Sequence, residues 1–124
     1  MAEIKYDSLV QYLIEAVPEL RSHYESWYEE MGEDFGPHVV YGDVLNPYLL
    51  TLLKSEGHEH ELQRIFSFLE RLASSDNARI REVVEVTVCE RLGDHTELLA
   101  KARKYMGAAT LRISHEIEKY LGRE

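Results

Sequence analysis

The segment DNARIREVVEVTVCERL, Asp76 to Leu92, decides the fold because it is the part of the chain that most resembles a β-strand. Its centre, VVEVTV (Val83–Val88), is rich in β-branched residues, which favour strands. The apolar positions nevertheless keep the spacing of one helix face, and DNARIRE before them is typical of an N-cap followed by a first helical turn. Those positions are Ile80, Val84, Thr87, Val88 and Leu92. Because β-branching weakens helix propensity only slightly, we predict that this segment is a helix. We therefore predict an all-α fold for the chain.

Helical periodicity continues outward from this segment in both directions. The expected helices span residues 3–16, 18–31, 37–56, 58–73, 77–92, 96–106 and 108–121. Pro47 falls inside the third and predicts either a kink or a new helix starting at Asn46. Because the linkers are short, neighbouring helices should pack antiparallel. We therefore expect one domain over residues 1–124, built from six to seven helices as irregular hairpins and HEAT-like in its C-terminal half.

The apolar positions of these helices predict one shared hydrophobic core. Its expected members are Leu13, Trp27, Val40, Leu49, Leu62, Phe66, Leu69, Ile80, Val84, Leu92, Leu99 and Ile117. A chain of 124 residues is long enough to bury such a core without disulfides or metals.

Composition and charge narrow the range of functions that the chain could have. The net charge is −9, and residues 1–36 alone carry −7. An acidic chain whose only basic cluster is the short KARKY (Lys101–Tyr105) with Arg112 disfavours nucleic-acid binding and favours a basic protein partner. The sequence shows no secretory signal and no apolar run as long as a membrane span, and its single cysteine fits a reducing compartment. We expect a cytoplasmic protein that binds neither nucleic acid nor membrane, and the sequence leaves its oligomeric state open.

The acidic N-terminal third contains the candidate binding site. In SHYESWYEEMGEDFGPHVVYGD (Ser22–Asp43), four apolar residues at positions 24, 27, 28 and 31 predict an inward stripe. Glutamates at positions 25, 29 and 33 form an outward row whose like charges, four residues apart, destabilise an isolated helix. A row that costs stability indicates a binding surface. The predicted partner-binding residues are Tyr24, Glu25, Tyr28, Glu29, Glu30, Glu33, Asp34 and Asp43.

Catalytic and metal-binding patterns are weak. In EGHEHEL, His58 and His60 lie two residues apart and point about 200° away from each other on a helix, so they cannot share an ion there. The sequence contains no phosphate-binding loop and no nucleophile elbow, and Cys89 lies on or beside an apolar stripe, as a buried structural thiol does. We expect no enzymatic activity, no catalytic residue, no cofactor and no metal.

Much of the chain resembles a group of small helical bacterial proteins that often occur among the immunity proteins of toxin systems. The similarity covers PHVVYGDVLNPYLLTLL, LQRIFSFLERLASSDNARIREVVEVTVCERLGD and KARKYMGAATLRISHEIEKYL, and it extends to VPEL at residues 17–20. Its distinctive points are Gly42–Asp43, Phe68–Glu70 and Tyr105–Gly107. The resemblance implies an all-helical fold without known catalytic residues.

Three functional hypotheses follow. The first is an immunity protein that neutralises a cognate toxin, with a basic, nuclease-type surface, by occluding it. The second is a HEAT-like scaffold that binds through its C-terminal helices, where Arg79, Arg81 or Lys104 would matter. The third is a metal-dependent enzyme that uses His58 and His60.

Overall fold

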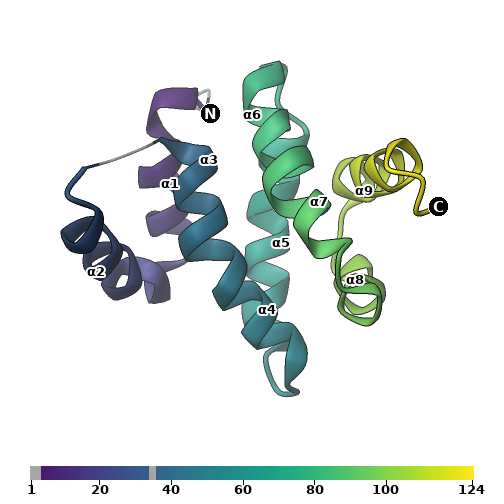
Figure 1. Cartoon of the computed structure of the whole chain (residues 1–124), viewed down its shortest axis with the longest axis horizontal. Helices are drawn as coiled ribbons and strands as arrows, with labels where there is room; N and C mark the ends of the chain where they lie inside the picture. Colours follow the sequence, from purple (N-terminus) through teal and green to yellow (C-terminus); the bar gives the residue numbers. More distant parts are fainter. Residues whose placement is uncertain (1–3, 34–35) are drawn as a thin grey trace.

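The computed structural model describes residues 4–33 and 36–124, and all its regular structure in these ranges is helical (Figure 1). The N-terminal part contains a 3₁₀ turn at Tyr6–Ser8, α1 (Leu9–Ala16), a 3₁₀ turn at Pro18–Leu20 and α2 (Arg21–Met31). Next come α3 (Pro37–Val40), a π-helical segment at Tyr41–Leu45, and α4 (Asn46–Lys54). The second half comprises α5 (Glu59–Ala73), α6 (Ala78–Glu82), a π-helical segment at Val83–Cys89, α7 (Glu90–Leu92), α8 (Thr96–Arg103) and α9 (Ala108–Tyr120). The all-α prediction is confirmed.

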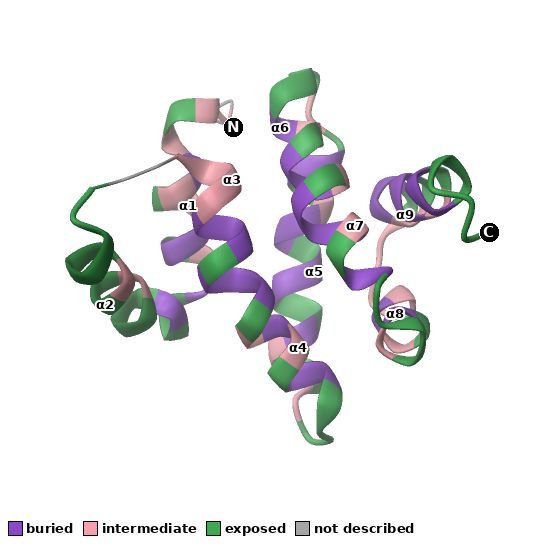
Figure 2. Ribbon diagram, viewed as in Figure 1, coloured by how far each residue is buried: buried purple, intermediate pink, exposed green. Residues whose placement is uncertain are grey.

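Helix α5 lies at the centre of the molecule. Its apolar residues recur every three or four positions, and those that are buried are Leu62, Ile65, Phe66, Phe68, Leu69, Leu72 and Ala73. Helices α1, α4, α6 and α9 all contact α5. The buried sides of these helices face α5 (Figure 2). Helix α5 runs antiparallel to the α6–α7 segment (Figure 1). Burying one leucine-sized side chain stabilises a fold by about 1.5–3 kcal/mol, so this stripe is a major contribution to the core.

Eleven of the twelve predicted core residues are buried. The exception is Trp27. Helical spacing predicts that it lies in the core, and this prediction is wrong because its side chain is only half-buried. Helix α2 buries no residue at all, because it lies at the edge of the molecule (Figure 2). Met31, which was also expected to point inward, is 41% exposed.

Two π-helical segments interrupt the α-helical pattern, and the first precedes Pro47, where the sequence predicts an interruption. Pro47 has no N–H, and in a regular α-helix its ring would clash with the carbonyl group four residues earlier. The structure widens the preceding turn instead, and the Asn46 N–H donates to the carbonyl of Tyr41, five residues back. In the β-branched segment, the Glu90 N–H likewise donates to the Glu85 carbonyl. The interruption at Asn46–Pro47 is therefore a π-helical turn within a continuous helical segment.

These widened segments lie against each other and are joined by buried polar contacts. The Asn46 side chain donates from Nδ2 to the Thr87 carbonyl oxygen at 2.8 Å, across 41 residues of sequence. Nearby, Tyr41 is fully buried, and its hydroxyl donates to the carbonyl of Leu9 at 2.9 Å. Both bonds satisfy polar groups that burial would otherwise leave without a partner, so they fix how α1, α4 and the Val83–Cys89 segment pack.

A carboxylate of α5 caps the first turn of α9. Glu70 accepts the backbone N–H groups of Ala109 and Thr110, both at 2.9 Å, and the Thr110 hydroxyl at 2.7 Å. A Cβ at Gly107 would lie 2.5 Å from the Glu70 side chain, so only glycine leaves room for this cap. Partial burial tends to raise the pKa of Glu70, but the N–H groups of Thr110 and Ala109 and the Thr110 hydroxyl hold that pKa below its ordinary value of 4.5.

The cap gives a pH-dependent contribution to stability. Because the pKa of Glu70 is lower in the folded chain than in the unfolded one, its contribution is complete above about pH 4.5 and is lost as the pH falls through the folded value. We expect Glu70→Gln to lower the free energy of unfolding by about 1–3 kcal/mol at pH 7. Urea denaturation followed by circular dichroism should show the gap to wild type closing at pH 3.5.

Glu116→Gln is the matched control, because Glu116 lies exposed on α9 and forms no hydrogen bond within the described residues. It should change stability by no more than about 0.5 kcal/mol at either pH. A gap between Glu70→Gln and wild type that stays constant from pH 7 to pH 3.5 would contradict the capping role.

Candidate functional site

Among the described residues of the acidic N-terminal third, helix α2 carries the most exposed large apolar side chains. Tyr28 is 43% exposed and Met31 is 41% exposed, and the surrounding residues Glu25, Glu29 and Glu30 are exposed as well. Tyrosine and methionine are enriched where proteins bind one another, whereas an ordinary solvated helix face carries few of them.

The indole of Trp27 attaches this helix to the rest of the molecule. Trp27 donates from its indole Nε1 to the carboxylate oxygen Oδ2 of Asp43 at 3.1 Å. Tyr24 stacks on Trp27 with 5.9 Å between ring centroids and an angle of 23° between the rings. At the foot of the helix, Leu20 is fully buried. Asp43 is therefore a positioning residue for α2, and its carboxylate ties the aromatic side of the helix to the Tyr41–Leu45 segment.

The structure brings only some of the predicted partner-binding residues together. Tyr24, Glu25, Tyr28 and Glu29 line one surface hollow. Glu30 and Asp43 line a different groove, on the side of α2 that faces α4, where Trp27 and Tyr48 also lie. Glu33 is exposed beyond the end of α2, and Asp34 lies outside the described residues. The predicted surface is thus two adjoining surfaces that meet along α2.

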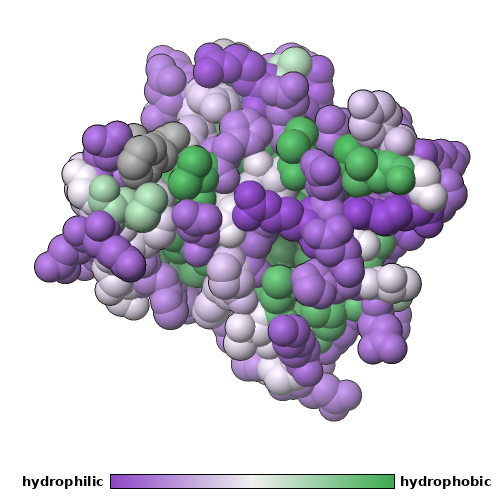
Figure 3. All heavy atoms as spheres, viewed as in Figure 1, coloured by the Kyte–Doolittle hydropathy of each residue, from purple (hydrophilic) through white to green (hydrophobic). Residues whose placement is uncertain are grey.

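A further groove, which the sequence did not predict, lies between the α3–α4 and α6–α7 segments. It encloses about 500 Å³ and is lined by His38, Val39, Asp43, Val86, Thr87, Glu90, Arg91 and Asp94. Both π-helical segments contribute to its walls. On the face where α3, α4, α6 and α7 lie, hydrophilic side chains predominate, with small hydrophobic patches between them (Figure 3).

Polar contacts hold one wall of this groove in place. His38 Nδ1 and Thr87 Oγ1 lie 2.7 Å apart and share a hydrogen bond. The Arg91 guanidinium packs on the opposite backbone, where a Cβ at Gly42 would come within 2.5 Å of its Nη1 atom. Arg91 forms no hydrogen bond or ion pair within the described parts of the chain, so its donors are available to a ligand or partner. A glycine inside a helical segment, as Gly42 is here, is a sequence signal for such a close approach.

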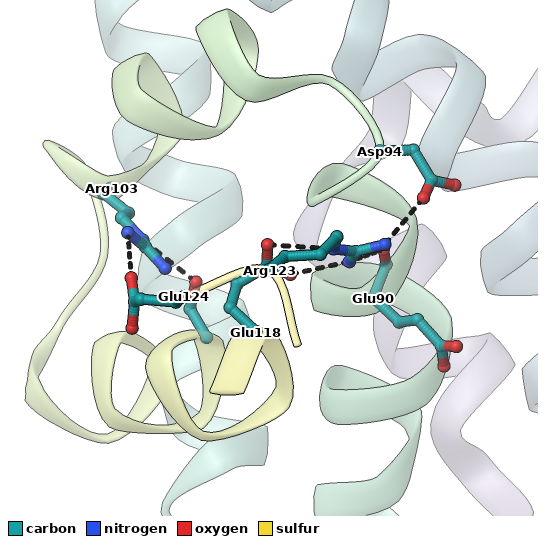
Figure 4. A network of polar contacts seen from close by, with 7 residues as sticks. Glu90, Asp94, Arg103, Glu118, Arg123 and Glu124 are labelled. Atoms are coloured by element: carbon teal, nitrogen blue, oxygen red, sulfur yellow. Dashed lines mark hydrogen bonds and ion pairs between the residues drawn. The ribbon is translucent and has the colours of Figure 1, made fainter. Parts of the chain in front are cut away.

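The acidic residues at the far end of this groove are partly occupied by the C-terminal segment. Arg123 donates to Asp94 at 2.9 Å, to the buried Glu118 at 2.6 Å and to the Glu90 carbonyl at 3.0 Å (Figure 4). The hydrogen bond with Glu118 raises the pKa of Arg123 above its ordinary value. Arg103 binds Glu124 at 3.1 Å next to this network (Figure 4). These contacts hold residues 122–124 against α7 and α9, which indicates a structural role.

The structure offers little for the metal-dependent hypothesis. The Nδ1 atom of His58 lies 3.5 Å from Oε1 of Glu61. His60 is exposed to solvent. Over residues 4–33 and 36–124, no three histidine, cysteine or carboxylate side chains are grouped so that they could hold a metal. Burial raises the pKa of Cys89 to about 12, which keeps the thiol protonated and therefore a poor nucleophile.

Comparison with known families adds one assignment. A family model described as a domain of unknown function, DUF7674, matches residues 10–122. The chain belongs to this family. No curated protein and no solved structure matches the chain, so the HEAT-like character of the C-terminal half stays a prediction. Among the helices of the described residues, none is both long enough and apolar enough to cross a membrane.

For this DUF7674 chain, the Trp27–Asp43 bond makes the position of α2 measurable, because Trp27 is the only tryptophan in the sequence. We expect Asp43→Ala to shift the fluorescence emission of Trp27 to longer wavelength and to increase its quenching by acrylamide. The reason is that the indole loses its carboxylate partner and becomes more exposed to water. The free energy of unfolding should fall by about 1 kcal/mol.

Glu30→Ala is the control, because Glu30 lines the same groove as Asp43 and forms no hydrogen bond within the described residues. It should leave emission and stability as in wild type. Unchanged emission and quenching in Asp43→Ala would show that the bond does not position α2.

Proposed function

We propose that this protein binds another protein through α2 and neutralises it without catalysis, in the manner of an immunity protein. The partner would be a toxin with a basic, nuclease-type surface, and binding would occlude its active surface in the cytoplasm. One observation carries the proposal: α2 buries no residue, and its exposed surface presents the apolar side chains of Tyr28 and Met31 among carboxylates.

The charge distribution supports a basic partner. The chain carries −9 overall and −7 within residues 1–36, so most of its net negative charge lies in the third of the sequence that contains α2. Carboxylates on such a surface accelerate association with a basic protein and oppose association with acidic ones. Aromatic residues next to them then supply the apolar contact that slows dissociation.

Site-directed crosslinking would identify the partner. A photoreactive phenylalanine analogue placed at position 28 should crosslink, in cells that carry the gene, to a protein with a basic surface. The control position is 120, because Tyr120 is 84% exposed but lies at the end of α9, distant in sequence from α2. A captured protein that arrests growth when expressed alone, and does so no longer when this chain is co-expressed, would support the immunity role. Crosslinks of equal yield at both positions, or none at position 28, would contradict it.

Charge reversal then measures the contribution of α2 to binding. We expect Glu25→Lys, Glu29→Lys and Glu30→Lys together to weaken binding of the captured partner by at least about tenfold, because three attractive charge pairs become repulsive. Calorimetric titration should show the loss, and raising the salt concentration should shrink the difference from wild type.

The matched control reverses three exposed glutamates elsewhere, Glu56, Glu82 and Glu116, which changes the net charge by the same amount. It should alter the affinity by no more than about threefold, since long-range charge effects are screened at physiological salt. If both triple variants lose affinity equally, overall charge rather than α2 drives binding.

A second candidate function is that of a helical scaffold that binds through the groove between the α3–α4 and α6–α7 segments. The observation that favours it is the Arg91 guanidinium, which lies in this groove without an ion pair in the described parts of the chain. Arg79 and Arg81 test this candidate less well, because Arg79 lies 3.9 Å from the centre of the Tyr6 ring and Arg81 donates to the Ser75 carbonyl at 2.6 Å. Under this candidate, Arg91→Ala would weaken partner binding and the α2 charge reversal would not.

A further inference from the structure

The hollow on the outer side of α2 has an arrangement of side chains that a general acidic surface does not require. Tyr24 and Tyr28 form one row with a spacing of four residues, and Glu25 and Glu29 form a second row beside it. These four residues line a hollow of about 500 Å³. The two tyrosine rings lie 6.0 Å apart, centroid to centroid, at an angle of 57°. The hollow therefore has aromatic rings along one side and carboxylates along the other.

From this arrangement we propose that the hollow is a guanidinium-binding site that receives an arginine side chain of the protein partner. This inference rests on the proposed function and specifies the chemistry of the partner. A guanidinium is planar, so one face can pack on the ring of Tyr28 while its N–H groups donate to Glu25 and Glu29. An ammonium group can satisfy the carboxylates but cannot stack in the same way.

The site is preorganised on its inner side. Tyr24 is stacked on Trp27, and Trp27 is bonded to Asp43, so the inner ring is held by the body of the protein. Glu25 and Glu29 form no ion pair or hydrogen bond within the described residues, and the structure does not pair Glu25 with Arg21, four residues earlier. A site whose aromatic wall is already fixed loses little conformational entropy when it binds.

Charge complementarity selects this occupant over others. The carboxylates of Glu25 and Glu29, which have no ion pair within the described parts of the chain, disfavour an anionic or a purely apolar partner segment, because burying them without a cation would leave their charges uncompensated. A second copy of α2 would present the same carboxylates and be repelled. An arginine satisfies both rows at once.

The test uses a small probe, so it does not require the partner. We expect N-acetylarginine amide, titrated into the isotopically labelled protein, to give saturable NMR shifts at Tyr24, Glu25, Tyr28 and Glu29. N-acetyllysine amide at the same ionic strength should bind at least about threefold more weakly, because it lacks the stacked contact. Shifts of equal size and affinity for the two probes, or shifts spread over other acidic residues, would overturn the proposal.

Two tyrosine variants separate the site from the surface charge in general. Tyr28→Leu should weaken binding of N-acetylarginine amide by about threefold or more, while Tyr120→Leu, which removes an exposed ring from α9, should leave it unchanged. The amide spectrum of each variant reports directly whether it is folded. Equal binding by Tyr28→Leu and wild type would overturn the proposal.

The failures of the two proposals can be distinguished. If the arginine probe binds at α2 but no partner crosslinks at position 28, the protein-binding function fails and the guanidinium site stands. If a partner crosslinks there but the probe gives no saturable shifts at α2, the function stands and the guanidinium site fails. Dimerisation of the purified chain that is abolished by Tyr28→Leu would assign the hollow to a second copy and also overturn the proposal.

Discussion

Burial of the apolar stripe of α5 is the constraint on which the rest of the structure depends. Leu62, Phe66, Leu69 and their neighbours recur with the helical period, so they line nearly the whole length of the helix. A stripe of this kind is stable only when other helices cover it, and α1, α4, α6 and α9 do so. The packing of these four helices around one central helix leaves α2 without a place in the core.

That exclusion gives α2 its functional interest. Because its apolar side chains find no deep contact, Tyr24 and Trp27 are only half-buried, and Tyr28 and Met31 remain accessible. Within the described residues, α2 is attached by the indole–carboxylate hydrogen bond, by the contact between the His23 and Tyr48 rings and by partly buried rings that pack against the core, rather than by a fully buried face. A helix that is attached in this way can present aromatic and acidic groups to a partner without exposing the core of the protein.

The short motifs that stand out in the sequence correspond to close contacts between distant segments. Gly42 gives room to Arg91 and Asp43 accepts Trp27, while Glu70 caps α9 in the space that Gly107 leaves. At Gly42 and Gly107, glycine is required because another side chain occupies the volume of a Cβ. Acid or amide groups then complete the contact, as Asn46 does when it bonds the Thr87 carbonyl between the two π-helical segments.

The sequence by itself determined the all-α class, the approximate limits of the helical segments and nearly all of the predicted core, because helical periodicity and caps are local properties of the chain. It also placed the acidic candidate surface on residues 24–34 and Asp43, since charge can be counted along the sequence. Which apolar stripe is buried depends on tertiary packing: spacing places apolar residues along one side of both α2 and α5, but α1, α4, α6 and α9 cover α5 and leave α2 at the edge. For the same reason, the groove around Arg91 and the separation of Glu30 and Asp43 from Tyr28 arise from contacts between segments far apart in sequence, which no local pattern encodes.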